Sequence, residues 1–299
     1  MSLTPTRCLA PAVMLAAVLA TPVRADLVLP RVSQAATVSQ TIGVTQMTVT
    51  YSRPGVKGRA IWGALVPYGK PWRTGANEAT TFTTTDEITV AGQKLPAGTY
   101  SFFTVPTRGA WTVIFSRQKD LWGAFSYDST QDQLRVSATP DTTAPHTEWM
   151  WLGFEDLGAS ACSLVLRWEK LRLAVPVTVN VDDRVLADCR TAVAGAKPDD
   201  WRTPYRAASW TFDAGVAPDE GRAWLERSIG IQANVQNMRL KALWLAKDGK
   251  MADAITTGDR AVALGKAAKE KDLTPVIEKQ VAEWKAAAPP PASGKAKKK

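Results

Sequence analysis

The chain has 299 residues, a hydrophobic fraction of 45%, and 37 Lys and Arg against 28 Asp and Glu. This apolar content excludes a wholly disordered polar polymer, and the length is enough for two domains. One His and three Cys exclude many zinc sites, because such sites need three or four ligands close together. We therefore expect no metal ion and no cofactor.

The first 25 residues have the pattern of an export signal. Arg7 supplies a positive charge, and an uncharged apolar stretch follows over residues 8–20. This stretch is shorter than the roughly 20 residues of a membrane-spanning helix, although a retained anchor is the alternative. Val23-Arg24-Ala25 ends in a small residue, so we expect cleavage after Ala25. The interpretation is a periplasmic or secreted protein with no transmembrane anchor after signal cleavage.

Two cysteines follow the predicted cleavage site. Cys162 lies in an apolar, strand-like run, and Cys189 follows the last predicted strand. An oxidising compartment would allow them to pair. A disulfide and two unpaired thiols both stay open.

Residues 33–183 predict a β domain. Apolar and polar residues alternate from residue 37 onwards, as in the segments 47–51 and 111–115, and turn residues recur between these segments. About nine or ten short strands are expected, with no long helical pattern between them. Such spacing favours an antiparallel β-sandwich or jelly-roll-like domain.

The pattern changes near residue 184. Residues 183–200 are rich in Ala, Asp and Gly, and we expect them to form a linker. From Trp201 onwards apolar residues recur at spacings of three and four, which indicates a helical domain over residues 201–288. The predicted helices span residues 204–214, 218–232, 235–247, 251–269 and 274–288.

The helical part shows signs of an internal repeat. Gly215 and Gly249 lie 34 residues apart, and each is expected to follow a helix. A two-helix repeat of this length is typical of tetratricopeptide proteins, although Gly258 stands where a large aromatic residue is usual. Isolated helical hairpins cannot bury their apolar faces, so we expect this tetratricopeptide-like module to pack on the β domain or on a protein partner bound by helices 204–288.

The last residues have a different composition. Pro289, Pro290 and Pro291 end the last predicted helix, and residues 289–299 are expected to form a disordered basic tail. A run of charges at a chain end is typical of a solvated terminus. Since no basic stripe with interleaved aromatic residues occurs in the body, we expect no nucleic acid partner.

Several long motifs resemble a bacterial family catalogued as domain of unknown function 2911. The resemblance covers residues 33–181, and the helical half looks like the tetratricopeptide-like extension found on some members. It implies an exported β-rich protein and brings no established activity. The segments that carry it are YSRPGVKGR (51–59), IWGALVPYG (61–69), WRTGANEAT (72–80), LPAGTY (95–100), HTEW (146–149) and LRWEK (166–170).

Polar and aromatic residues cluster between Arg53 and Glu78. Glycines at 55 and 58 permit tight turns, and the stretch is too irregular for one strand, so we expect a long, structured and functional loop. Arginines could bind a carboxylate, sulfate or phosphate, and aromatic rings could stack on a sugar or a peptide side chain. The candidate residues for a small polar ligand or glycan are Arg53, Lys57, Arg59, Trp62, Tyr68, Trp72, Arg73, Asn77 and Glu78.

Two other interpretations stay open. The loop could be purely structural, with its charged and amide side chains satisfying backbone groups and its tryptophans in the core. Alternatively, the protein could be a hydrolase acting on cell-envelope glycan or peptide material, with Glu78, His146 and Glu148 as acid–base groups. Because no nucleophile motif accompanies these residues, the sequence favours a non-catalytic binding or scaffold protein.

Overall fold

The computed structural model describes residues 29–287. The predicted export signal and its cleavage site lie outside the described residues, and so does the predicted tail at 289–299.

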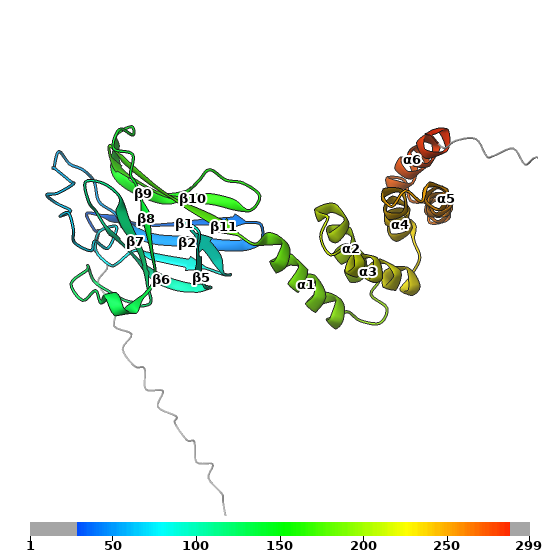
Figure 1. Ribbon diagram of the computed structural model, residues 1–299, viewed down its shortest axis with the longest axis horizontal. Coiled ribbons are helices and arrows are strands. Elements are labelled where there is room, and N and C mark those ends of the chain that lie inside the picture. Colours follow the sequence, from blue (N-terminus) through cyan, green and yellow to red (C-terminus); the bar gives the residue numbers. More distant parts are fainter. Residues whose placement is uncertain (1–28, 288–299) are drawn as a thin grey trace, which may run out of the picture.

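Eleven strands in the described part of the chain form two antiparallel sheets that pack face to face (Figure 1). This confirms the predicted β-sandwich. The first sheet has the order β1 (Gln34–Ile42), β2 (Thr45–Arg53), β3 (Thr81–Thr84), β6 (Gly98–Val105), β7 (Trp111–Ser116), β8 (Asp132–Ala138). The second has the order β5 (Gln93–Leu95), β4 (Ile88–Val90), β11 (Leu171–Val179), β10 (Ala161–Glu169), β9 (Thr147–Glu155).

One hydrophobic core fills the space between the sheets. Met47, Val49 and Tyr51 alternate along β2 and are all buried, as their spacing predicts, because successive side chains of a strand point to opposite faces. The Tyr51 hydroxyl accepts a hydrogen bond of 3.0 Å from the backbone N–H of Leu152 in β9. This contact ties the first sheet to the second.

Helices follow the sandwich, and the five predicted helices are confirmed. Gly215 and Gly249 adopt φ of 72° and 76° just after α2 and α4, a conformation that favours glycine. Among residues 29–287 no helix is long and apolar enough to cross a membrane. The helices are α1 (Val181–Gly195), α2 (Arg202–Ala214), α3 (Pro218–Ile231), α4 (Val235–Lys247), α5 (Met251–Ala267) and α6 (Leu273–Ala287).

The predicted linker at 183–200 is wrong, because helix α1 occupies most of it. The side chain of Asn180 accepts a hydrogen bond from the N–H of Asp183 and so caps the helix, and Asp182 and Asp183 place negative charge in its first turn. Alanine, which the composition suggested was linker material, is the strongest helix former.

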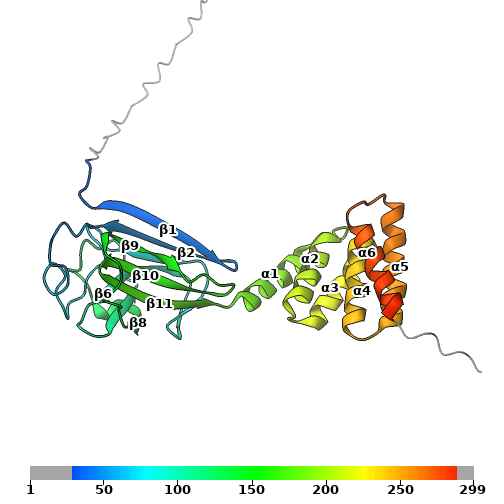
Figure 2. The same cartoon turned by 90° about the horizontal axis from the view of Figure 1, so that it is seen from above.

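Helix α1 joins the helices to one end of the sandwich (Figure 2). Val181, the first residue of α1, contacts Gly43 in the β1–β2 turn, and Arg184 donates a hydrogen bond of 2.7 Å to Asp86. Residues 54–80 connect the other end of β2 to β3, so this loop lies at the end of the sandwich away from α1 (Figure 1).

Gly258 departs from the usual repeat pattern for a physical reason. It lies in α5 against α6, and a Cβ atom added there would lie 2.4 Å from Cγ2 of Val281. Trp284 of α6 also lies within 4 Å of that position. The last helix therefore takes the space that a large side chain at residue 258 would fill.

We predict that Gly258→Leu destabilises the helical part by about 1–3 kcal/mol through overpacking against α6. Gly230→Leu is the matched control, since nothing lies within 4 Å of a Cβ at Gly230 and leucine favours a helix more than glycine does. Denaturant unfolding followed by circular dichroism measures both variants. Equal stability of the two would show that the α5–α6 contact is not tightly packed.

Candidate functional site

The long loop over residues 54–80 is a structured element, as predicted. Trp72 and Thr104 of β6 exchange two backbone hydrogen bonds of 2.8 and 2.9 Å. Nearer its start, the N–H of Val56 donates to the carbonyl of Glu148 at 2.8 Å, and the N–H of Met150 donates to the carbonyl of Pro54 at 2.9 Å. The loop is thus bonded to strands of both sheets.

Four tryptophans hold the loop on the sandwich. Trp62 and Trp72 come from the loop, Trp111 from β7 and Trp168 from β10. The Trp62 ring meets the other three edge-on at centroid distances of 5.0–5.9 Å, and Trp72 stacks on Trp168 at 5.8 Å. Trp72 also donates its indole N–H to the carbonyl of Gly75 at 3.1 Å.

A cavity of about 240 Å³ opens between this cluster and the loop. Its walls are apolar on one side and cationic on the other. The lining residues are Val32, Ser33, Pro54, Gly55, Lys57, Arg59, Leu65, Val66, Trp72, Arg73, Gly75, Ala76 and Trp168. We call this cavity the loop pocket.

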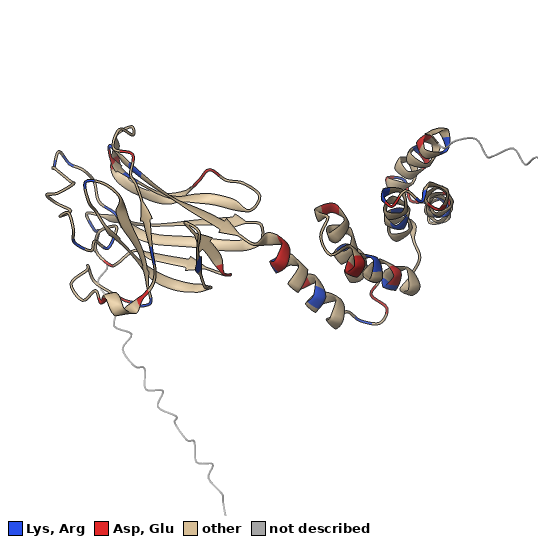
Figure 3. Ribbon diagram, viewed as in Figure 1, with Lys and Arg blue, Asp and Glu red and all other residues tan. Residues whose placement is uncertain are grey.

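Three cations line the loop pocket, and no Asp or Glu does. Two of the cations are partly engaged. The Lys57 ammonium lies over the ring of Trp149, 5.6 Å from its centroid. Arg59 donates to the loop carbonyls of Val56 and Gly55. Figure 3 shows Lys and Arg positions distributed along the loops at this end of the sandwich.

Arg73 is the third cation, and its charge has no counterpart in the described structure. Its side chain makes no hydrogen bond and no ion pair with residues 29–287, and its Nε atom is buried without a partner. Burial lowers the pKa of the guanidinium. A buried cation without an acceptor is costly, so this position favours a bound anion.

Two indole groups in the tryptophan cluster add further unpaired donors. The Nε1 atoms of Trp62 and Trp168 are buried and have no hydrogen-bond partner within the described chain. Trp168 lines the loop pocket, and Trp62 packs edge-on against it. Indole N–H groups only donate, so the pocket and its wall present donors that require an acceptor.

The other predicted ligand-binding residues lie around the loop pocket and do not line it. Trp62 belongs to the tryptophan cluster. Arg53 donates to the carbonyl of Met150 at 2.8 Å, and Tyr68 lies under the guanidinium of Arg108 at 5.4 Å. Asn77 donates to the carbonyl of Ser33 at 3.1 Å.

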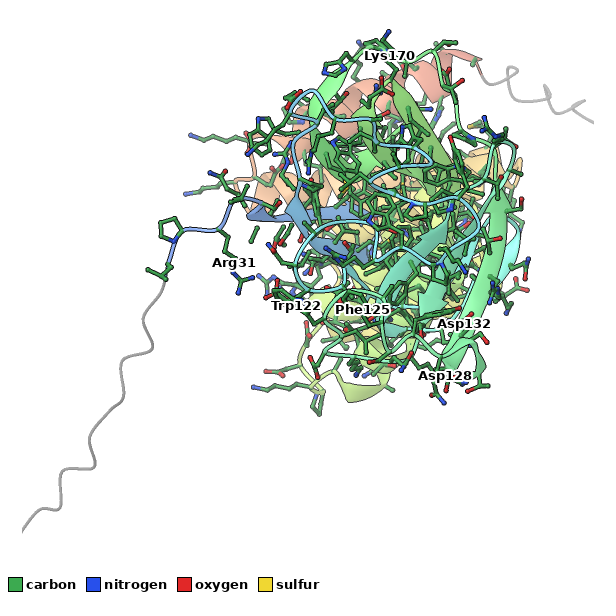
Figure 4. The ribbon with its side chains drawn as sticks, turned by 90° about the vertical axis from the view of Figure 1, so that its left-hand side faces the viewer. Arg31, Trp122, Phe125, Asp128, Asp132 and Lys170 are labelled. Atoms are coloured by element: carbon green, nitrogen blue, oxygen red, sulfur yellow. The ribbon has the colours of Figure 1, made fainter. Side chains whose placement is uncertain are left out.

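Glu78 pairs with Arg31 and not with Arg73. Two hydrogen bonds of 2.5 and 2.7 Å join Arg31 to the carboxylate, and this contact holds the pKa of Glu78 below its usual range. Figure 4 views this end of the molecule, where Arg31 lies on the same face as Trp122 and Phe125. Both aromatic side chains are exposed, by 61% and 89%.

The geometry does not favour the acid–base alternative. His146 Nε2 lies 3.4 Å from Glu148 Oε2, as their shared strand face predicts, and both side chains are about half exposed. The backbone N–H of Lys57 donates to Glu148 and, with a smaller contribution from His146, lowers the pKa of Glu148. A carboxyl group that acts as a general acid near neutral pH needs a raised pKa, and the pKa values of Glu78 and Glu148 are both lowered.

The two cysteines of the described chain are free. Cys162 is buried in β10, where burial raises the pKa of its thiol to about 11, and Cys189 lies on α1. A thiol with so high a pKa is a poor nucleophile at neutral pH. These cysteines therefore add no reactive group to the site.

The comparisons with known proteins agree with the β half of the structure. Residues 33–177 match the model of the family described as Protein of unknown function (DUF2911). No curated protein and no solved structure matches the chain. The family confirms the resemblance seen in the motifs, and the DUF2911 match assigns no activity, so function has to be argued from the loop pocket itself.

Sequence reasoning missed part of the DUF2911 pocket wall. Trp168 comes from β10, and Val32 precedes β1, so both are distant in sequence from the loop. Leu65 lies within the loop but resembles an ordinary core residue. No local signal marks these residues, because only the packing of the two sheets brings them to the loop.

We predict that Arg73→Met leaves the melting temperature of the ligand-free protein unchanged or raises it, since the substitution removes a buried charge and orphans no partner. Arg53→Met is the control. It leaves the carbonyl of Met150 without its donor, so it should cost about 1–3 kcal/mol and lower the melting temperature by several degrees. Differential scanning calorimetry measures both, and an equal loss in the two variants would show that Arg73 has a structural partner.

Proposed function

We propose that this protein is an exported, non-catalytic binding protein of the cell envelope. In this proposal the sandwich holds a small anionic ligand in the loop pocket, and the helices bind a protein partner. The single observation that carries it is the loop pocket with Arg73 at its wall. A cationic cavity that no carboxylate lines, with a buried guanidinium Nε atom that has no partner in the described chain, supports the binding of an anion.

The pattern of the first 25 residues supports export. We predict that the mature protein begins at Asp26 when the full chain is expressed in a Gram-negative host. Mass spectrometry of the periplasmic fraction measures the N-terminus. Ala25→Lys is the control, since a large charged residue blocks cleavage by signal peptidase. Recovery of the wild-type chain with residues 1–25 intact would contradict this part of the proposal.

The spacing of the helices supports a tetratricopeptide-like interaction module. The first residues of α2 and α4, Arg202 and Val235, are 33 positions apart, and so are the first residues of α3 and α5, Pro218 and Met251. Stacked two-helix units of this length form extended surfaces that bind other proteins. This supports the proposed role of the helices.

Anion binding tests the main proposal. We expect at least one of acetate, phosphate, sulfate or phenylacetate to raise the melting temperature at constant ionic strength, and we expect Arg73→Met to abolish the rise. Arg108→Met is the matched control, because Arg108 lies over Tyr68 and does not line the loop pocket. Loss of the effect in both variants would indicate general electrostatics, and no effect in the wild type would overturn the proposal.

A further inference from the structure

We infer that the ligand of the loop pocket is a small monocarboxylate that carries one apolar group. This inference rests on the proposed function and names the chemical class of its ligand. Three features of the described structure carry it: the number of uncommitted cations, the nature of the walls, and the size of the cavity.

The uncommitted charge of the loop pocket matches one negative charge. Lys57 is engaged with the ring of Trp149, and Arg59 donates to two loop carbonyls. Arg73 alone has neither an acceptor nor an ion-pair partner among residues 29–287. A phosphate group carries about −1.5 to −2 at neutral pH, so its burial would leave negative charge uncompensated. A carboxylate carries one charge and fits the two-pronged guanidinium.

The apolar wall requires an organic ligand. Val32, Leu65 and Val66 line the loop pocket together with the rings of Trp72 and Trp168. An inorganic anion would leave these surfaces in contact with water, whereas an apolar group on the ligand would cover them and gain free energy. The unpaired indole N–H of Trp168 offers one more donor to the carboxylate.

The size of the loop pocket limits the ligand. A volume of about 240 Å³ lies below the roughly 300–1,000 Å³ of pockets that hold drug-sized molecules. The pocket therefore fits one carboxylate and one ring or branched chain. Such a group exists in a free small acid and at the C-terminus of a peptide that ends in an apolar residue.

Isothermal titration calorimetry with defined probes tests the inference on the full mature chain. We expect phenylacetate to bind, and phenylacetamide, which has the same shape without the charge, to bind at least tenfold more weakly. Inorganic phosphate tests the charge argument, and glucuronate, a polar carboxylate of similar size, tests the apolar wall. We expect both to bind more weakly than phenylacetate.

Variants and a spectroscopic signal locate the binding. Arg73→Met should weaken phenylacetate at least tenfold, Arg73→Lys should weaken it less because it keeps the charge and loses the fork, and Arg108→Met should have no effect. In a ¹H–¹⁵N spectrum the indole N–H signal of Trp168, assigned by Trp168→Phe, should move on addition of phenylacetate. A peptide Gly-Gly-Phe with a free C-terminus, compared with its amide, distinguishes a peptide end from a free acid.

The outcomes separate the two levels of the argument. Binding of phosphate or glucuronate in preference to phenylacetate, lost in Arg73→Met, would overturn the apolar monocarboxylate and leave the anion pocket in place. Equal binding of phenylacetate and phenylacetamide would also overturn the monocarboxylate. If no probe binds, the proposed function falls together with the inference.

Discussion

The contact among four indole rings is the interaction on which the loop pocket depends. Two rings belong to the long loop, one to each sheet, so the cluster forms only when both sheets and the loop have packed together. Each edge-on or stacked aromatic pair contributes about 0.5–1.5 kcal/mol beyond the burial of its area. Trp72 has a double role, because its ring packs in the cluster while its backbone pairs with Thr104 in β6. The residue next to it, Arg73, is thereby fixed in position.

A fixed arginine without a partner is unusual in a structure whose other arginines are mostly engaged. Arg167 and Arg172 share the carboxylate of Glu155, and Arg31 pairs with Glu78. The contrast indicates that the loop does not hold Arg73 for stability. Sites that are preorganised for a ligand commonly carry such a cost, because a rigid, unsatisfied group loses little entropy on binding and gains its missing partner.

The helical part follows a different physical logic. Its sequence repeats at about one hairpin length, and each helix packs mainly on its neighbours along the chain, as contacts between α4 and α5 and between α5 and α6 illustrate. Gly258 shows how a departure from a repeat pattern can record a tertiary contact, since its missing side chain admits Val281 of the last helix. The loop pocket lies at the end of the sandwich away from α1, so ligand binding and partner binding would use separate surfaces (Figure 1).

The sequence by itself determined the two halves, five helices almost to the residue, and the long loop, because periodicity, helix caps and turn glycines act over a few residues. It misread residues 183–200, where alanine-rich composition was taken for a linker and the cap at Asn180 was overlooked. It named Lys57, Arg59, Trp72 and Arg73 among nine candidates, and could not separate them from Tyr68 or Asn77. Tertiary structure alone decided that separation, and it added Trp168 and Val32, because which side chains face one cavity depends on how two sheets and a loop pack, and residue spacing does not encode that packing.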